Sequence, residues 1–236
     1  MLRLHQFEIS PFCDKVRRIL HVKGQPYEVV EVPLVQSMRR IPQVNPIGKL
    51  PCLEHDGRRV ADSTDIARYL EETFPSPPLL PADPRERALC HVLEDWADES
   101  LYFYEMALRF TVPANARRFV PVLLAHDPPW FRRVAAGLVP TLMRRTTRAQ
   151  GVGRKPREMQ LADVERHLEA LNGMLGDGAW LVGGGLTLAD VSVFAQLACI
   201  AATEEGADAL ARWPRVAAWL ERVDQATAPG VGAGAG

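Results

Sequence analysis

The chain has 236 residues, of which 47% are hydrophobic and 24% charged, as in globular proteins with a sizeable core. Its formal net charge is −1, so no overall basic field favours nucleic acid, and no uncharged run approaches the roughly 18 residues of a membrane-spanning helix. The amino terminus lacks the apolar run of a secretory signal, and four widely spaced cysteines show no CxxC or CxxH pattern. We therefore expect a cytoplasmic protein with no transmembrane segment, no disulfide framework, no metal site and no nucleic-acid partner.

Residues 1–76 alternate strand and helix signals. The predicted elements, in chain order, are a strand (2–7), a helix (11–24), a strand (27–34), a loop, a two-stranded hairpin (50–62) and a helix (62–74). The hairpin prediction comes from Asp56-Gly57, a two-residue turn signal between two short apolar runs.

A proline-rich segment follows, and every later pattern is helical. Five of the ten residues from Pro75 to Pro84 are proline, which predicts a stiff extended linker. Helix signals then occupy 82–110, 161–175, 186–202 and 213–226, and Thr187 with Asp190 forms a T-x-x-D capping box. The expected organisation is an amino-terminal domain (1–76), a linker (77–84), an all-helical domain (85–227) and a disordered tail (228–236).

The stretch Ser10-Pro11-Phe12-Cys13 raises the main chemical question. Ser10 is placed to cap a helix that has Pro11 in its first turn, and a helix amino terminus lowers the pKa of a nearby thiol. The thiol in question is either Cys13 itself or one brought from outside and held by the Ser10 hydroxyl. Cys13 falls on the apolar face of the helix, where a thiol is inert, and a third interpretation is a capping serine with a buried cysteine.

A second group of residues suggests a peptide site. Pro51 begins a predicted strand, which a cis Leu50–Pro51 bond would explain, and Leu50 would then present its backbone to an extended peptide. Asp62 and Ser63 open the next helix, whose amino terminus suits a carboxylate, while Asp62 suits an ammonium. Together with a binding site for a thiol beside Ser10, these features predict a small thiol-containing peptide as ligand.

A basic run lies between Asp127 and Glu158. It contains no acidic residue but has Arg132, Arg133, Arg144, Arg145, Arg148, Arg154, Lys155 and Arg157. Such a run suits anions or a membrane surface, although a solvated helix face is the interpretation we favour.

Together these motifs resemble the soluble glutathione transferase family. The resemblance lies in Ser10 to Cys13, Asn45 to Pro51, Asp62-Ser63 and Leu186 to Asp190, in the family's order and with a proline-rich linker in the family's place. The active-site motif is similar to that of the serine-type tau and zeta classes, and the segment from Gly151 to Leu197 also resembles a metaxin-like branch. The resemblance implies a thioredoxin-like amino-terminal domain that binds glutathione, followed by an all-helical domain that binds an electrophile.

The resemblance also assigns roles. It implies Ser10 as the catalytic residue that stabilises the glutathione thiolate. It implies a glutathione site formed by Lys49, Leu50, Pro51, Asp62 and Ser63, with Arg39 or Arg40 as an addition whose register is open. The family usually has Glu or Gln in place of Asp62, so the reach to the ammonium is shorter here.

Three functions remain open at this point. The leading one is conjugation of glutathione to small hydrophobic electrophiles, with peroxide reduction as a further activity, by a homodimer. The others are a non-catalytic interaction protein and a thiol transferase that uses Cys13. The expected substrate pocket is formed by Phe12, Trp96, Tyr102, Tyr104, Met106 and Phe110, although packing in the core or a dimer explains each aromatic equally well.

Overall fold

A computed structural model describes residues 1–45 and 47–228. The disordered tail expected at 228–236 lies, apart from Ala228, outside these residues. The strands are β1 (Leu2–Gln6), β2 (Tyr27–Glu31), β3 (Cys52–His55) and β4 (Arg58–Ala61). The helices of the amino-terminal part are α1 (Pro11–Val22), α2 (Leu34–Val44) and α3 (Ser63–Thr73). Those of the helical part are α4 (Pro84–Trp96), α5 (Tyr102–Thr111), α6 (Pro113–Leu123), α7 (Pro129–Gln150), α8 (Arg157–Leu175), α9 (Leu188–Ala201), α10 (Glu204–Leu210) and α11 (Pro214–Thr227).

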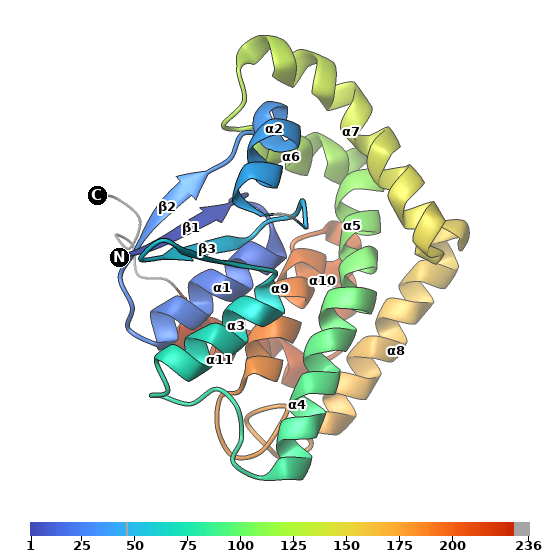
Figure 1. Ribbon diagram of the computed structural model, residues 1–236. Helices are drawn as coiled ribbons and strands as arrows, with labels where there is room; N and C mark the ends of the chain where they lie inside the picture. Colours follow the sequence, from blue (N-terminus) through green and yellow to red (C-terminus); the bar gives the residue numbers. More distant parts are fainter. Residues whose placement is uncertain (46, 229–236) are drawn as a thin grey trace.

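The four strands form one mixed sheet in the order β2-β1-β3-β4. β1 pairs in parallel with β2 and antiparallel with β3, which forms a hairpin with β4. The sheet lies on the left of the molecule in Figure 1 and α4, α5, α7 and α8 lie on the right, while α9 and α11 pack against α1. The hairpin turn is the predicted one, and Asp56 and Gly57 adopt φ values of 49° and 85°. The fold class expected from the sequence, a small α/β unit followed by an all-helical unit, is confirmed.

The two parts share a core. Leu4, Val16 and Ile66 from the amino-terminal part belong to the same buried cluster as Leu101 and Leu197. A second cluster, formed by residues of α5, α6 and α7, packs against Ile9 and Leu34. The helical part therefore supports the loop at the start of α1 directly.

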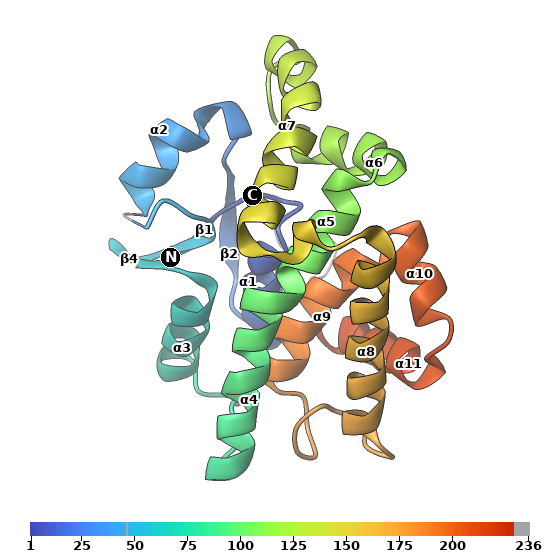
Figure 2. The same ribbon diagram turned by 90° about the vertical axis from the view of Figure 1, so that its right-hand side faces the viewer.

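The loop predicted between the second and third strands is wrong, because α2 forms there. Its first backbone N–H groups, those of Leu34 and Val35, donate to the carboxylate of Asp127 at 3.1 and 2.7 Å. Asp127 follows α6, and both views show α2 near the turn between α6 and α7 (Figures 1 and 2). The helix thus takes its amino-terminal cap from a residue more than ninety positions away.

The segment from α4 to α5 also differs in detail from a single uninterrupted helix. A π-helical turn occupies Ala97–Leu101, and a short 3₁₀ turn, Val152–Arg154, separates α7 from α8. The predicted capping box at α9 is present, with Thr187 and Asp190 bonded to each other.

Candidate functional site

Ser10 lies in the loop that joins β1 to α1 and caps the helix. Its Oγ accepts a hydrogen bond from the backbone N–H of Cys13 at 3.4 Å, and its own N–H donates to the carbonyl of Phe7 at 3.1 Å. Because the oxygen accepts from the helix, the hydroxyl proton is free to point away from it.

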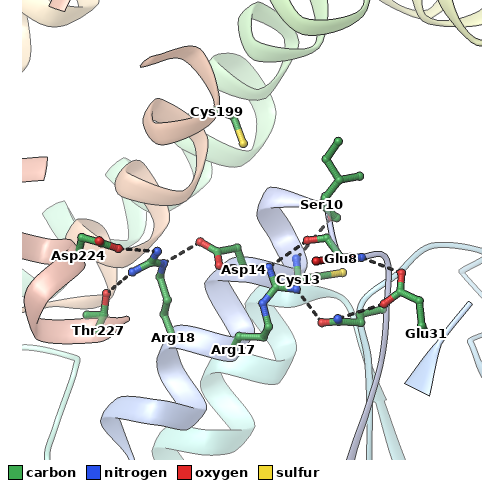
Figure 3. A network of polar contacts seen from close by, with 12 residues as sticks. Glu8, Ser10, Cys13, Asp14, Arg17, Arg18, Glu31, Cys199, Asp224 and Thr227 are labelled. Carbon is green, nitrogen blue, oxygen red and sulfur yellow. Dashed lines mark hydrogen bonds and ion pairs between the residues drawn. The ribbon is translucent and has the colours of Figure 1, made fainter. Parts of the chain in front are cut away.

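A polar network holds this loop from below (Figure 3). Arg17 donates to Gln6 Oε1 at 2.7 Å and to the carbonyl of Glu8 at 3.1 Å. Glu31 at the end of β2 accepts from the N–H of Glu8 at 2.8 Å. On the other side, Arg109 of α5 donates to the carbonyl of Ile9 at 3.3 Å. The position of Ser10 is therefore set by contacts with β2, α1 and α5.

Cys13 is fully buried one turn into α1, and burial raises the pKa of its thiol to about 11. Burial likewise raises the pKa of Cys52 and Cys90 to about 11 and that of Cys199 to about 12. All four cysteines are free thiols. Cys13 has no exposed surface and a raised pKa, the opposite of a reactive cysteine, which disfavours a thiol transferase that uses Cys13.

A cavity of about 630 Å³ lies between the two parts of the molecule, with Ser10 in its lining. Most residues proposed from the sequence line it together, namely Ser10, Phe12, Lys49, Leu50, Pro51, Asp62, Ser63, Tyr102, Met106 and Phe110. The bond between Leu50 and Pro51 is cis, as predicted.

Two proposed pocket residues lie elsewhere. Trp96 and Tyr104 pack against His167 of α8, with ring centroids 5.3 and 5.2 Å from it, and neither lines the cavity. Tyr104 follows Tyr102 by two positions and so points to the opposite side of the same helix. Arg39 and Arg40 are exposed on α2 and are also absent from the lining.

The polar end of the cavity is formed by the start of α3. Asp62 has a φ of 78° and caps the helix by accepting from the N–H of Thr64 at 2.9 Å. The buried Ser63 hydroxyl donates to Asp98 at 3.4 Å. Asp65, Asp95 and Glu99 add further carboxylates to the lining. This end of the cavity is therefore strongly acidic, with backbone N–H groups at its base.

Beneath it, Lys15 of α1 forms a buried ion cluster with two carboxylates of α4 and the π-helical turn. Its ammonium donates to Asp98 at 2.8 Å and to Glu94. Burial alone would lower the pKa of Lys15, but Asp98 and Glu94 together raise it. The cluster ties α1 to the helical part directly beside Ser63.

The other end of the cavity is apolar. Phe12 and Tyr102 meet edge to face, with ring centroids 4.7 Å apart. Sequence reasoning missed several wall residues, which are Leu34 and Ile41 of α2, Leu123 of α6, and Met143 of α7. It also missed Glu105 and Arg109, a buried ion pair with a 3.0 Å contact that borders the cavity. In the sequence, these two residues stand out only as opposite charges four positions apart within an apolar helix.

Within residues 1–45 and 47–228, no group of three or more His, Cys, Asp or Glu side chains is placed to hold a metal ion. No helix in the same ranges has the length and apolar character needed to cross a bilayer.

Comparisons with known proteins agree with this arrangement. Glutathione S-transferase U7 of Arabidopsis thaliana is 34% identical over 98 residues, which are 41% of this chain and 43% of that protein. Glutathione S-transferase 1 of Dianthus caryophyllus is 41% identical over 91 residues, which are 37% of this chain and 41% of that protein. The aligned part thus spans less than half the length of these curated relatives. A solved β-etherase from Sphingobium sp. strain SYK-6 is 27% identical, with a TM-score of 0.69 over 94% of both chains.

Two family descriptions match the chain in the order that the fold requires. The N-terminal domain of glutathione S-transferase matches residues 4–78, and its C-terminal domain matches residues 128–222. The two matches together cover most of the sequence, and they include Ser10, the Leu50–Pro51 segment and the start of α3 on one side of the cavity and Met143 on the other. The chain therefore belongs to the glutathione S-transferase family.

Proposed function

We propose that this protein transfers glutathione to small apolar electrophiles, with Ser10 as the catalytic residue. The observation that supports this most directly is one cavity that joins Ser10, the cis Leu50–Pro51 segment and the start of α3 to an apolar wall. A thiol peptide and an apolar molecule can meet there within reach of the Ser10 hydroxyl.

The polar end suits the γ-glutamyl group of glutathione. The backbone N–H groups at the start of α3 receive its carboxylate, since Asp62 takes only the N–H of Thr64. The ammonium lies among the carboxylates of Asp62, Asp65 and Asp95. Leu50 pairs with the cysteinyl backbone as a neighbouring strand would, and the exposed Lys49 approaches the glycyl carboxylate.

Ser10 acts on the sulfur. Its hydroxyl donates to the thiolate, which favours the charged form and lowers the thiol pKa, and the amino terminus of α1 adds a positive dipole end. The sulfur then forms a bond with an electrophilic carbon, and the leaving group departs with the electron pair of the broken bond.

A second candidate reaction is glutathione-dependent cleavage of an ether. The β-etherase neighbour resembles this chain over almost its full length, whereas the curated relatives align over less than half of theirs. In that reaction the leaving group is an alkoxide or phenoxide. Ser10 again stabilises the glutathione thiolate, and the apolar wall binds the ether.

The test compares Ser10→Ala with Cys13→Ala in conjugation, peroxidase, ether-cleavage and disulfide-reduction assays. Loss of the Ser10 donor should raise the pKa of the bound thiol and lower turnover at neutral pH on the order of tenfold to thousandfold. Cys13→Ala should leave turnover nearly unchanged. Loss of turnover in Cys13→Ala alone would contradict this assignment, and a folded protein that binds no glutathione by calorimetry would favour the interaction-protein alternative.

The active form in this proposal is a cytoplasmic homodimer in which the amino-terminal part of one chain meets the helical part of the other. Leu89 and Val92 of α4, which are 41% and 64% exposed, support it because they leave apolar surface uncovered in the single chain. Light scattering that finds a stable monomer at micromolar concentration would contradict it.

A further inference from the structure

Helix α7 carries an exposed row of large apolar side chains. Trp130, Val134, Leu138 and Leu142 are 63%, 58%, 63% and 58% exposed. They follow one another at four-residue intervals, so they form a single ridge along the helix. The helix lies along the outer edge of the molecule in Figure 1 and in front of α5 in Figure 2.

This ridge is not the face that packs into the protein. The inward row lies one position further along the sequence and contains the buried Ala135, Val139 and Thr147, with Met143 in the cavity wall. The inward row packs α7 against α5 and α6. The outward row takes no part in that packing, so it is exposed apolar surface in the single chain.

Arginines border the ridge. Arg133 and Arg145 occupy the next row around the helix, and Arg132, Arg144 and Arg148 are exposed beyond it. Among the described residues, none of these five guanidinium groups has an ion pair or a side-chain hydrogen bond. No acidic residue occurs between Asp127 and Glu158, although the whole chain has a formal net charge of −1. Positive charge is thus concentrated on the helix that bears the ridge.

We propose that α7 docks on an anionic lipid surface. The apolar ridge would lie at the level of the headgroups, as in a basic amphipathic helix that rests on a membrane without crossing it, and the arginines would bind lipid phosphates. A convex ridge on an outer helix suits a flat surface. A symmetric contact between two α7 helices would bring the same arginines together without a single carboxylate from this segment, so charge favours lipid over a second copy.

The position of Met143 connects this surface to the cavity. Met143 lines the apolar end of the cavity from the side of α7 that faces inward. A protein held on lipid by the outer side of α7 therefore keeps that end of its cavity close to the membrane, where apolar molecules accumulate.

Sedimentation with lipid vesicles tests the proposal on the full-length protein. The protein should bind vesicles of equimolar phosphatidylcholine and phosphatidylglycerol, and bind phosphatidylcholine alone much more weakly. Raising the salt concentration should weaken the binding, since exposed charges are screened. Equal binding to both kinds of vesicle, or binding to neither, would overturn the proposal.

Matched variants separate the ridge from the rest of the surface. Leu138→Asp with Leu142→Asp, and Arg133→Glu with Arg145→Glu, should each lower partitioning onto anionic vesicles on the order of tenfold or more. Met174→Asp at the far end of α8 and Arg85→Glu at the start of α4 are the apolar and charged controls and should bind as the parent does.

All variants should keep the circular dichroism spectrum and the glutathione-binding affinity of the parent, because their side chains are exposed and outside the cavity. Unchanged vesicle binding in both double variants would refute the role of α7. So would light scattering in which the Leu138→Asp, Leu142→Asp protein alone dissociates from dimer to monomer, since the ridge would then be an interface between copies of the chain.

Discussion

The buried ion cluster beneath the site predicts a large and pH-dependent effect of Lys15→Met. The side chains of Lys15, Glu94 and Asp98 are only 1%, 4% and 9% exposed. Methionine fills similar space, so the substitution removes the charge while it leaves little cavity. Two carboxylates would then remain in the interior without their cation.

The expected cost follows from this geometry. Removing one partner of a buried ion pair costs about 3–5 kcal/mol, because the remaining charge keeps its desolvation penalty. The free energy of unfolding of a domain is only about 5–15 kcal/mol, so Lys15→Met should remove a large fraction of it at pH 7. Denaturant unfolding followed by circular dichroism measures this loss.

The loss should shrink in acid. Burial already raises the pKa of Asp98, and without the opposing charge of Lys15 this pKa should rise further above the unfolded value of about 4. The folded variant then binds protons that the unfolded chain does not bind as the pH falls from 7 towards 5, so its stability rises relative to the parent. The triple variant Lys15→Met, Glu94→Gln, Asp98→Asn should recover most of the stability at pH 7. A loss under about 1 kcal/mol that does not vary with pH would refute the reasoning, because a buried unpaired charge must cost more.

Three further outcomes are expected. Ser10→Cys places a thiol at the amino terminus of α1, where its pKa falls, and should form a mixed disulfide with glutathione that intact-mass spectrometry detects. Asp190→Ala should cost about 3 kcal/mol or more in denaturant unfolding, since its fully buried carboxylate accepts from the N–H of Leu181 and from Trp219 Nε1, both at 2.9 Å. Burial lowers the pKa of His167 in the folded chain. Below about pH 6.5 the unfolded chain therefore binds a proton at His167 that the folded chain does not bind, so stability falls as the pH drops. His167→Phe should therefore lose less stability between pH 7 and pH 5 than the parent, and a steeper loss would contradict the burial of this ring.

Features that depend on neighbours in the chain could be predicted from the sequence. The Ser10 cap, the turn at Asp56-Gly57 and the box formed by Thr187 and Asp190 each join residues at most three positions apart. Their hydrogen bonds form within one turn, so residue type and spacing determine them almost alone. The alternation of strand and helix signals, with the proline-rich segment after it, likewise indicated the fold class.

The tertiary structure alone decided what depends on distant contacts. α2 could not be predicted because its cap, Asp127, belongs to another part of the chain. Trp96 and Tyr104 point toward α8 because of the way their helices pack against it. Their aromatic character alone does not tell whether they face α8 or the cavity. The partners of Lys15 lie 79 and 83 positions away in sequence. Such contacts arise only when the helices pack, because burial and ion pairing depend on distance in space rather than along the chain.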